Sequence, residues 1–297
     1  MKCAEMIGIL NELAPEQIAC TWDNVGLLAG RREKQVEKLL LCLDVTDQVI
    51  QYGMEHKIDM IVSHHPLLFR PVKNITDGTM IGRRLLNLIQ GDISYYAMHT
   101  NFDCAEKGMA YAAANRLGLQ EQSILDEEIF YENAEGKKVP GGIGRIGKLQ
   151  ESMSVEMLQQ VICSAFQIEG LMVYGKDLRK QVSRVAISPG SGKDQIEAAL
   201  QAKADVLITG DISHHSGLDA KEQGLVVIDA GHYNIEHIFS EYVAGYLREK
   251  LFSHVEISVF PEERPYTIYY ESVVNVHTDR GACTPRCVNI RQPNLYE

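Results

Sequence analysis

Short apolar runs alternate with segments of helical periodicity along most of the chain, and this alternation is the strongest constraint on its fold. Examples of the runs are EKLLLCLDVT (37–46), MIVS (60–63) and DVLITG (205–210). Each run has an almost continuous apolar centre too short for a helix, as expected for a strand that is buried on both faces. Strands of this kind separated by helices form βαβ units with parallel strands, so the sequence predicts an α/β fold.

The same order of elements occurs twice. A strand, a helix, a second strand and a third strand that ends in a histidine motif are predicted near residues 37–103 and again near residues 182–236. We therefore expect two similar βαβ-containing lobes with mixed or parallel sheets. Whether the halves arose by duplication stays open, because they match in topology and hardly in sequence. Ligands of open α/β sheets bind at the carboxyl ends of strands, so a site is expected there, between the lobes.

Residues 121–150 interrupt the alternation, since they are acidic at first and then glycine-rich, with a single strand predicted near 143–149. We take this interruption as a change of lobe. The expected division is a first lobe at 1–125, a second lobe at 126–244, a segment at 245–270 that packs back on the first lobe, and a tail at 271–297.

Charge and hydropathy exclude two classes of partner. The net charge is −11, whereas non-specific binding of nucleic acid requires a basic surface. A local basic pocket for a small phosphate stays open. No stretch approaches the roughly 18 consecutive apolar residues of a membrane span, so no membrane partner is expected.

The first residues and the cysteines indicate a cellular location. Residues 2–14 have the periodicity of an amphipathic helix, and Glu5 and Glu12 within them are unlike the apolar centre of an export signal. The seven cysteines are odd in number and mostly scattered through apolar stretches, as is usual for reduced thiols. The sequence therefore predicts a cytoplasmic protein.

Histidine and carboxylate side chains gather just after the predicted strands. Adjacent strands bring such residues to one edge of a sheet, and a histidine and a glutamate four residues apart lie on one helix face. Imidazole suits zinc, iron, cobalt or nickel, and carboxylates also accept manganese and bridge two ions. The four groups are His64 with His65, His99 with Asp103, Asp211 with His214 and His215, and His232 with Glu236.

Each group has an ordinary structural explanation when it is considered alone. Adjacent histidines commonly form a polar loop, and His99 could bond to the backbone at a strand end. His232 could cap its helix, and Glu236 could be a solvated surface acid. Because several separate strand ends carry these residues at the same predicted edge, a metal site explains the whole set better.

Three other features carry less weight. The segment SPGSGKDQ (188–195) is glycine-rich between a strand and a helix, but it lacks the spacing of a P-loop, so contact with an anion stays open. His277, Cys283 and Cys287 form a weak metal motif in a stretch better explained as a tail. No GxSxG sequence is present to indicate a serine nucleophile.

The strand-end motifs, taken in order, resemble those of the Nif-three-like family, also called the GTP cyclohydrolase I type 2 homologues or the dinuclear metal-centre hexameric proteins. The resemblance covers about residues 1–260. It rests on TWDNVGLLAG (21–30), IVSHHPLLF (61–69), MHTNFD (98–103), LITGD (207–211) and DAGHYNIE (229–236).

The resemblance implies two α/β lobes with a pair of divalent metal ions between them, for which zinc, iron and manganese are the candidates. It also implies a homohexamer whose metal sites face an internal cavity. Residues 121–180 are too few for the full inserted domain of longer family members. The metal ligands that the family motifs imply are His64, His65, Asp103, His232 and Glu236.

The leading hypothesis is a metal-dependent hydrolase that acts on a nucleotide or another small phosphorylated or heterocyclic molecule. GTP as substrate is implied by the resemblance alone. Asp103 or Glu236 would bridge the ions, and the candidate catalytic residues are His99, as an orienting group or a general acid or base, and His215, which with Asp211 would line the pocket. The alternatives are a non-enzymatic metal chaperone, store or regulatory scaffold, or a protein–protein adaptor.

Overall fold

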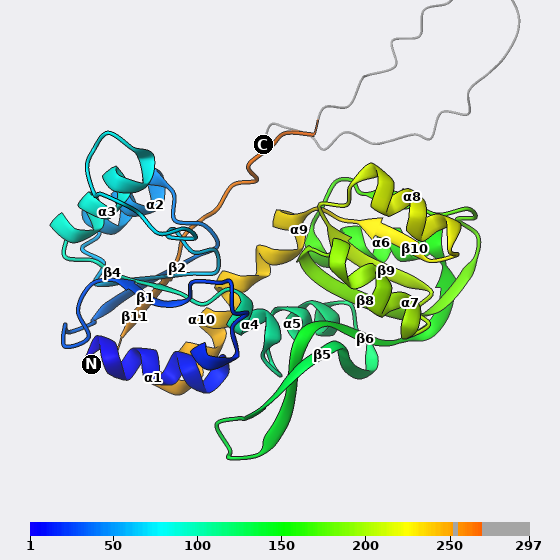
Figure 1. Ribbon diagram of the computed structural model, residues 1–297, viewed down its shortest axis with the longest axis horizontal. Coiled ribbons are helices and arrows are strands. Elements are labelled where there is room, and N and C mark those ends of the chain that lie inside the picture. The colour runs from blue at the N-terminus through cyan, green and yellow to red at the C-terminus, as the bar shows by residue number, and fades with distance from the viewer. Residues whose placement is uncertain (252–254, 269–297) are drawn as a thin grey trace, which may run out of the picture. The chain divides into compact units, whose positions relative to one another are not determined.

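The computed structural model describes residues 1–251 and 255–268, and residues 1–266 form one compact unit that contains two β-sheets (Figure 1). The predicted tail at 271–297, with its histidine and cysteines, lies outside the described residues. Both sheets are mixed and helices pack on them, which confirms the predicted α/β class. Among the described helices, none has the length and apolar character that a membrane span requires.

The first sheet has five strands, in the order β1-β4-β3-β2-β11. Four of them are parallel, and β1 pairs with β4 in the antiparallel direction. β11 joins the sheet by pairing with β2, although about 200 residues separate them in the chain. The strands are β1 (Gly26–Ala29), β2 (Lys38–Cys42), β3 (Met60–Ser63), β4 (Ser94–Ala97) and β11 (Glu256–Val259).

Helices cover both faces of this sheet, which explains the continuous apolar runs. Leu39 and Leu41 of β2 belong to the core that includes α1 (Cys3–Leu13). Leu40 and Cys42 pack instead with residues of α2 (Asp47–Glu55) and α3 (Met80–Gln90). Because successive strand residues point to opposite faces, a strand covered on both sides must be apolar at every position.

The second sheet has six strands, in the order β5-β6-β8-β9-β10-β7. Its centre, β8-β9-β10, is parallel, and the strands on either side are antiparallel. One apolar core contains side chains from both sheets and from the helices α1, α5, α6 and α10. The strands are β5 (Gln120–Glu132), β6 (Lys138–Ser154), β7 (Met172–Tyr174), β8 (Gln181–Ser191), β9 (Val206–Gly210) and β10 (Val226–Asp229).

The remaining helices connect and cover these strands. α7 and α8 contribute to a smaller core on one face of the second sheet, whereas α5 packs against β6, β8 and α10. Their bounds are α4 (Thr100–Cys104), α5 (Met109–Arg116), α6 (Val155–Phe166), α7 (Ile196–Gln201), α8 (His214–Glu222), α9 (His232–Glu236) and α10 (Ile238–Leu251), with 3-10 turns at Glu16–Ile18 and Lys193–Gln195.

The structure differs from the predicted elements in three places. The segment at 121–150, predicted to hold one strand near 143–149, is a long hairpin of β5 and β6 that projects in Figure 1. The helical periodicity of about residues 233–252 predicts one long helix, which the structure divides at His237 into α9 and α10. β1 was not predicted. The exact lobe boundaries stay a prediction, because residues 1–266 cluster as a single unit.

The aromatic core beneath the edge of the first sheet yields a test of stability. Phe239 is fully buried, and its ring centroid lies 5.3 Å from that of Phe102. We expect Phe239→Ala to lower the free energy of unfolding by about 3–5 kcal/mol, since it removes a buried ring and leaves a cavity. Urea denaturation measures the change. The matched control is Phe130→Ala, because Phe130 is 62% exposed and its loss should cost less than about 0.5 kcal/mol. Equal effects would contradict the packing described here.

Candidate metal centre

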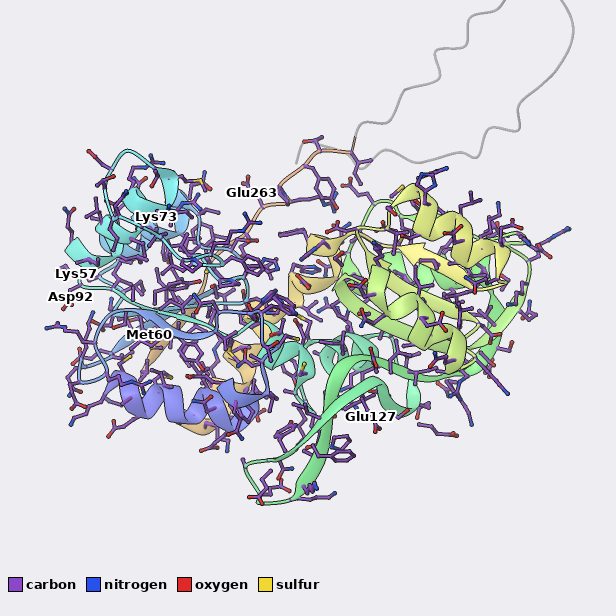
Figure 2. All side chains as sticks on the ribbon, viewed as in Figure 1. Lys57, Met60, Lys73, Asp92, Glu127 and Glu263 are labelled. Carbon is purple, nitrogen blue, oxygen red and sulfur yellow. The ribbon has the colours of Figure 1, made fainter. Side chains whose placement is uncertain are left out.

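Three strand ends deliver the predicted metal ligands to one place between the two sheets, in a region that side chains fill (Figure 2). β3 ends at Ser63, directly before His64 and His65. β4 is followed by α4, which carries Asp103. β10 leads into α9, whose first and last residues are His232 and Glu236. The parallel strands thus bring together side chains that are far apart in sequence, as predicted.

Hydrogen bonds at Nδ1 fix the orientation of four histidine rings. In each ring Nδ1 donates to an oxygen atom, so in the neutral form Nε2 carries a lone pair that can bind a metal ion. Three of the four acceptors are carboxylates, the usual partners of metal-binding histidines. The pairs are His64 with the Met98 carbonyl (3.1 Å), His65 with Asp44 (3.0 Å), His99 with Asp23 (2.9 Å) and His232 with Asp211 (2.8 Å).

His65, His232 and Glu236 form a triangle of potential ligand atoms. The two Nε2 atoms are 3.1 Å apart, and Oε2 of Glu236 is 3.0 Å from Nε2 of His65 and 2.8 Å from Nε2 of His232. Oε2 is nevertheless buried without a properly aligned hydrogen bond among the described residues. Ligands of a tetrahedral zinc ion lie about 3.3 Å from one another, so this triangle fits one ion after a small expansion.

The other oxygen of Glu236 faces a second group. Nε2 of His64 lies 3.7 Å from Oε1 of Glu236 and 3.7 Å from Oδ1 of Asp103, which is too far for hydrogen bonds. This Nε2 atom is fully buried and has no hydrogen-bond partner among the described residues. The potential ligand nitrogens of His64, His65 and His99 also lie within 4.8 Å of one another. Glu236 therefore has the placement of a carboxylate that bridges two ions.

Opposite charges are held close together in this cluster. Burial opposes protonation of His65, but the hydrogen bond with Asp44 and the close carboxylate of Glu236 outweigh it and raise the pKa of His65 to about 10. Burial also opposes protonation of His232, but the carboxylates of Glu236 and Asp211 outweigh it and raise the pKa of His232 to about 9. Burial raises the pKa of Asp103. Metal ions must displace the histidine protons, and their positive charge would then neutralise the buried carboxylates.

Two glycines allow the backbone to approach the cluster. Gly190 has φ +73°, and a Cβ atom there would lie 2.6 Å from Oε1 of Glu236. A Cβ atom at Gly210 would lie 2.5 Å from the backbone nitrogen of His232. The glycine-rich segment at 188–195 thus forms a wall of the metal centre. Whether it also contacts an anion stays a prediction.

A cavity of about 450 Å³ opens beside the cluster, a size typical of small-molecule sites. Asp103, His232 and Glu236 line it, together with His99. Trp22, Phe69, Ser188 and Gln195 contribute to its walls. A molecule bound there would contact the potential metal ligands directly.

Not every predicted residue joins the cluster. His215 lies in the first turn of α8, exposed to solvent, and its ring contact is with His214 at 5.2 Å. A catalytic role for His215 stays a prediction that this position does not favour. Asp211 lies beside the cluster and orients His232.

The orienting roles of Asp23 and Asp44 were not predicted from the sequence. Asp44 follows a predicted strand, as the ligand motifs do, and this position was the available signal. Asp23 precedes β1, a strand that was not predicted. The available signal for Asp23 was therefore its place within the TWDN motif. Its side chain is fully buried and also accepts hydrogen bonds from the backbone nitrogen and hydroxyl of Thr100.

These residues could hold divalent metal ions in two groups. The donor set is imidazole nitrogen and carboxylate oxygen, which suits zinc, iron or manganese. The buried ligand atoms without partners, and the carboxylates that orient the histidines, are features that a metal centre explains and an ordinary polar core does not.

The chain is similar in sequence to known proteins over most of its length. A relative from Clostridium perfringens, named GTP cyclohydrolase 1 type 2 homolog, is 37% identical over 264 residues, covering 89% of this chain and 98% of the relative. One of the same name from Methanocaldococcus jannaschii is 33% identical over 238 residues, covering 80% and 90%.

Solved structures agree with the fold. The crystal structure of Staphylococcus aureus protein SA1388 matches with a TM-score of 0.81 and 28% identity, covering 91% of this chain and 99% of that one. A Bacillus cereus protein related to NIF3 has a TM-score of 0.82 at 24% identity, which shows a shared fold. Residues 1–265, which make up most of the chain, match the model of the Duf34/NIF3 (NGG1p interacting factor 3) family. This chain therefore belongs to that family.

Proposed function

We infer that the chain is a metal-dependent hydrolase that acts on a nucleotide or another small phosphorylated or heterocyclic molecule. The observation that carries the proposal is that three candidate ligands, Asp103, His232 and Glu236, line an open cavity. Metal ions held by them together with His64 and His65 would face a bound molecule there. A purely structural metal site would have its ligands closed off by protein.

The chemistry follows from the arrangement of side chains. A pair of divalent ions, when bound, supplies a water of lowered pKa and polarises the electrophilic group of the substrate. Glu236 would hold both ions through its two oxygens. His99, whose Nδ1 proton is held by Asp23, would present Nε2 to the cavity and exchange a proton there with the substrate.

The names of relatives support the substrate class only in general terms. The Clostridium perfringens relative is named as a homologue of a GTP cyclohydrolase, which implies hydrolytic chemistry on a nucleotide. Zinc, iron and manganese are all compatible with the ligand set, and availability would decide among them.

A second candidate is a metal chaperone, store or regulatory scaffold. Two further cavities, of about 480 and 510 Å³, lie beside His65 and carry several carboxylates. Carboxylates at the approach to a site concentrate cations, which is useful for metal transfer whether or not catalysis follows. These carboxylates are Asp44, Asp211, Asp229, Glu262 and Glu263.

The test of the hydrolase is Asp103→Ala in metal-reconstituted protein, assayed against a panel of nucleotides and phosphoesters. We expect metal-dependent turnover that falls by about 100-fold or more, because the variant removes a ligand of one ion. Asp77→Ala is the matched control, since Asp77 is exposed on a loop, and it should retain full activity. Tight metal binding without turnover across the panel would instead favour the chaperone, store or scaffold. A partner that still binds after loss of the ligands would indicate an adaptor.

A second prediction concerns the orienting carboxylates. Asp44→Asn should weaken metal binding by about 10-fold to 100-fold, because the charge that holds His65 is lost while the ligand itself remains. Competition with a chromophoric chelator measures the affinity. Asp47→Asn is the control: Asp47 is only three residues away, but it pairs with Arg83 and Arg84. Equal affinities for the two variants would contradict the role given to Asp44.

A homohexamer in the cytoplasm is also proposed, and it rests on the family resemblance. Six chains of 33.3 kDa give a mass of about 200 kDa. Light scattering on the purified protein measures that mass, and a monodisperse species of about 33 kDa would rule the hexamer out.

A further inference from the structure

Two large aromatic side chains are exposed inside the cavity beside the metal centre. Trp22 is 60% exposed and Phe69 is 49% exposed, although both line a concave site. Their ring centroids are 5.9 Å apart, and that of Trp22 lies 6.1 Å from that of His99. Single exposed aromatics are common on protein surfaces, but these two line one cavity and their rings are tilted by 58°, so a planar ring can stack on one and make an edge contact with the other.

Several other residues that line this cavity have polar side chains that can accept hydrogen bonds. Ser188, Ser191 and Gln195 come from the glycine-rich end of β8 and the turn that follows. Asp126 of β5 and Asp194 add two carboxylates. Carboxylate and amide oxygens recognise the N–H groups at the edge of a nitrogen heterocycle.

The charges in the cavity disfavour a ligand that carries a polyphosphate chain. None of the described residues that line it is a lysine or an arginine. Sites for polyphosphates usually supply such side chains, as the lysine of the P-loop does. This cavity instead carries two carboxylates besides the candidate ligands, Asp126 and Asp194, which would repel a phosphate chain bound beside them. Like charges at close range in a partly buried site repel strongly.

We propose that this cavity selects a planar nitrogen heterocycle that carries no polyphosphate chain, such as a free base, a nucleoside or a nucleoside monophosphate. The ring stacks on Trp22 and meets the tilted ring of Phe69 at its edge, its N–H groups donate to Asp126, Asp194 or Gln195, and its reactive carbon faces the histidine cluster. This inference rests on the proposed hydrolase, because it names the substrate class of the same site.

Trp22 is the one tryptophan of the chain, so its fluorescence reports directly on the cavity. The experiment titrates guanosine, GMP and GTP into zinc-loaded full-length protein, and the zinc retained is measured after each titration. We expect guanosine and GMP to quench the emission with dissociation constants at least fivefold lower than that of GTP. Ribose 5-phosphate, which has no aromatic ring, should not quench it.

Two variants test the aromatic pair. Phe69→Ala should weaken guanosine binding by about fivefold to tenfold, in line with the loss of one aromatic contact with the base. Phe130→Ala also removes an exposed phenylalanine, but one outside the cavity, and should bind guanosine like the unchanged protein. Circular dichroism confirms that both variants are folded. Tighter binding of GTP than of guanosine, or equal affinities of the two variants, would overturn the proposal.

The outcome separates this inference from the proposed function. Quenching by nucleosides without turnover of any compound would support the heterocycle site and contradict the proposed hydrolase function. Metal-dependent turnover of a phosphoester that has no ring, in protein that no nucleoside quenches, supports the hydrolase and removes the heterocycle site.

Discussion

The candidate metal centre depends on the hydrogen bonds that Nδ1 of four histidine rings donates. Asp44, Asp211 and Asp23 each accept a hydrogen bond from one ring, and the Met98 carbonyl does so for His64. These contacts fix the tautomer, and Nε2 of His64, His65 and His232 faces Glu236 or Asp103. Without them the rings could rotate or bond to water, and the same residues would form an ordinary polar loop. The α/β scaffold places the histidines near one another, and the hydrogen-bond acceptors at Nδ1 set the direction in which each Nε2 atom points.

Much of the fold and of the cluster could be predicted from the sequence, because both follow from local patterns. A strand that is buried on both faces is apolar at every position. The end of such a strand can therefore be located in the sequence, and with it the histidines that follow. The β5–β6 hairpin could not be located in this way, because its glycines and acidic residues hide the alternation of a strand. The HH doublet at 214–215 looks like that at 64–65, yet it begins a helix on the outside of the sheet. Only the three-dimensional structure distinguishes the two.

The electrostatics of the region follow from the same arrangement. Buried carboxylates and histidines are balanced against each other in the centre, and further carboxylates surround its three cavities. Such a surface favours cations and neutral rings over polyanions. The acidity of the whole chain, which excluded nucleic acid as a non-specific partner, is therefore also found at the site itself. The exposed aromatic pair of Trp22 and Phe69 supplies the apolar contact that a ring needs.

The ligands come from two different sheets, and this has a mechanical consequence. His64, His65 and Asp103 follow strands of the first sheet, whereas His232 and Glu236 follow a strand of the second. An ion bound by both sets would act as a cross-link, so that neither half could separate without releasing it. Metal loading should consequently raise the free energy needed to separate the two sheets, in addition to the apolar core that they already share.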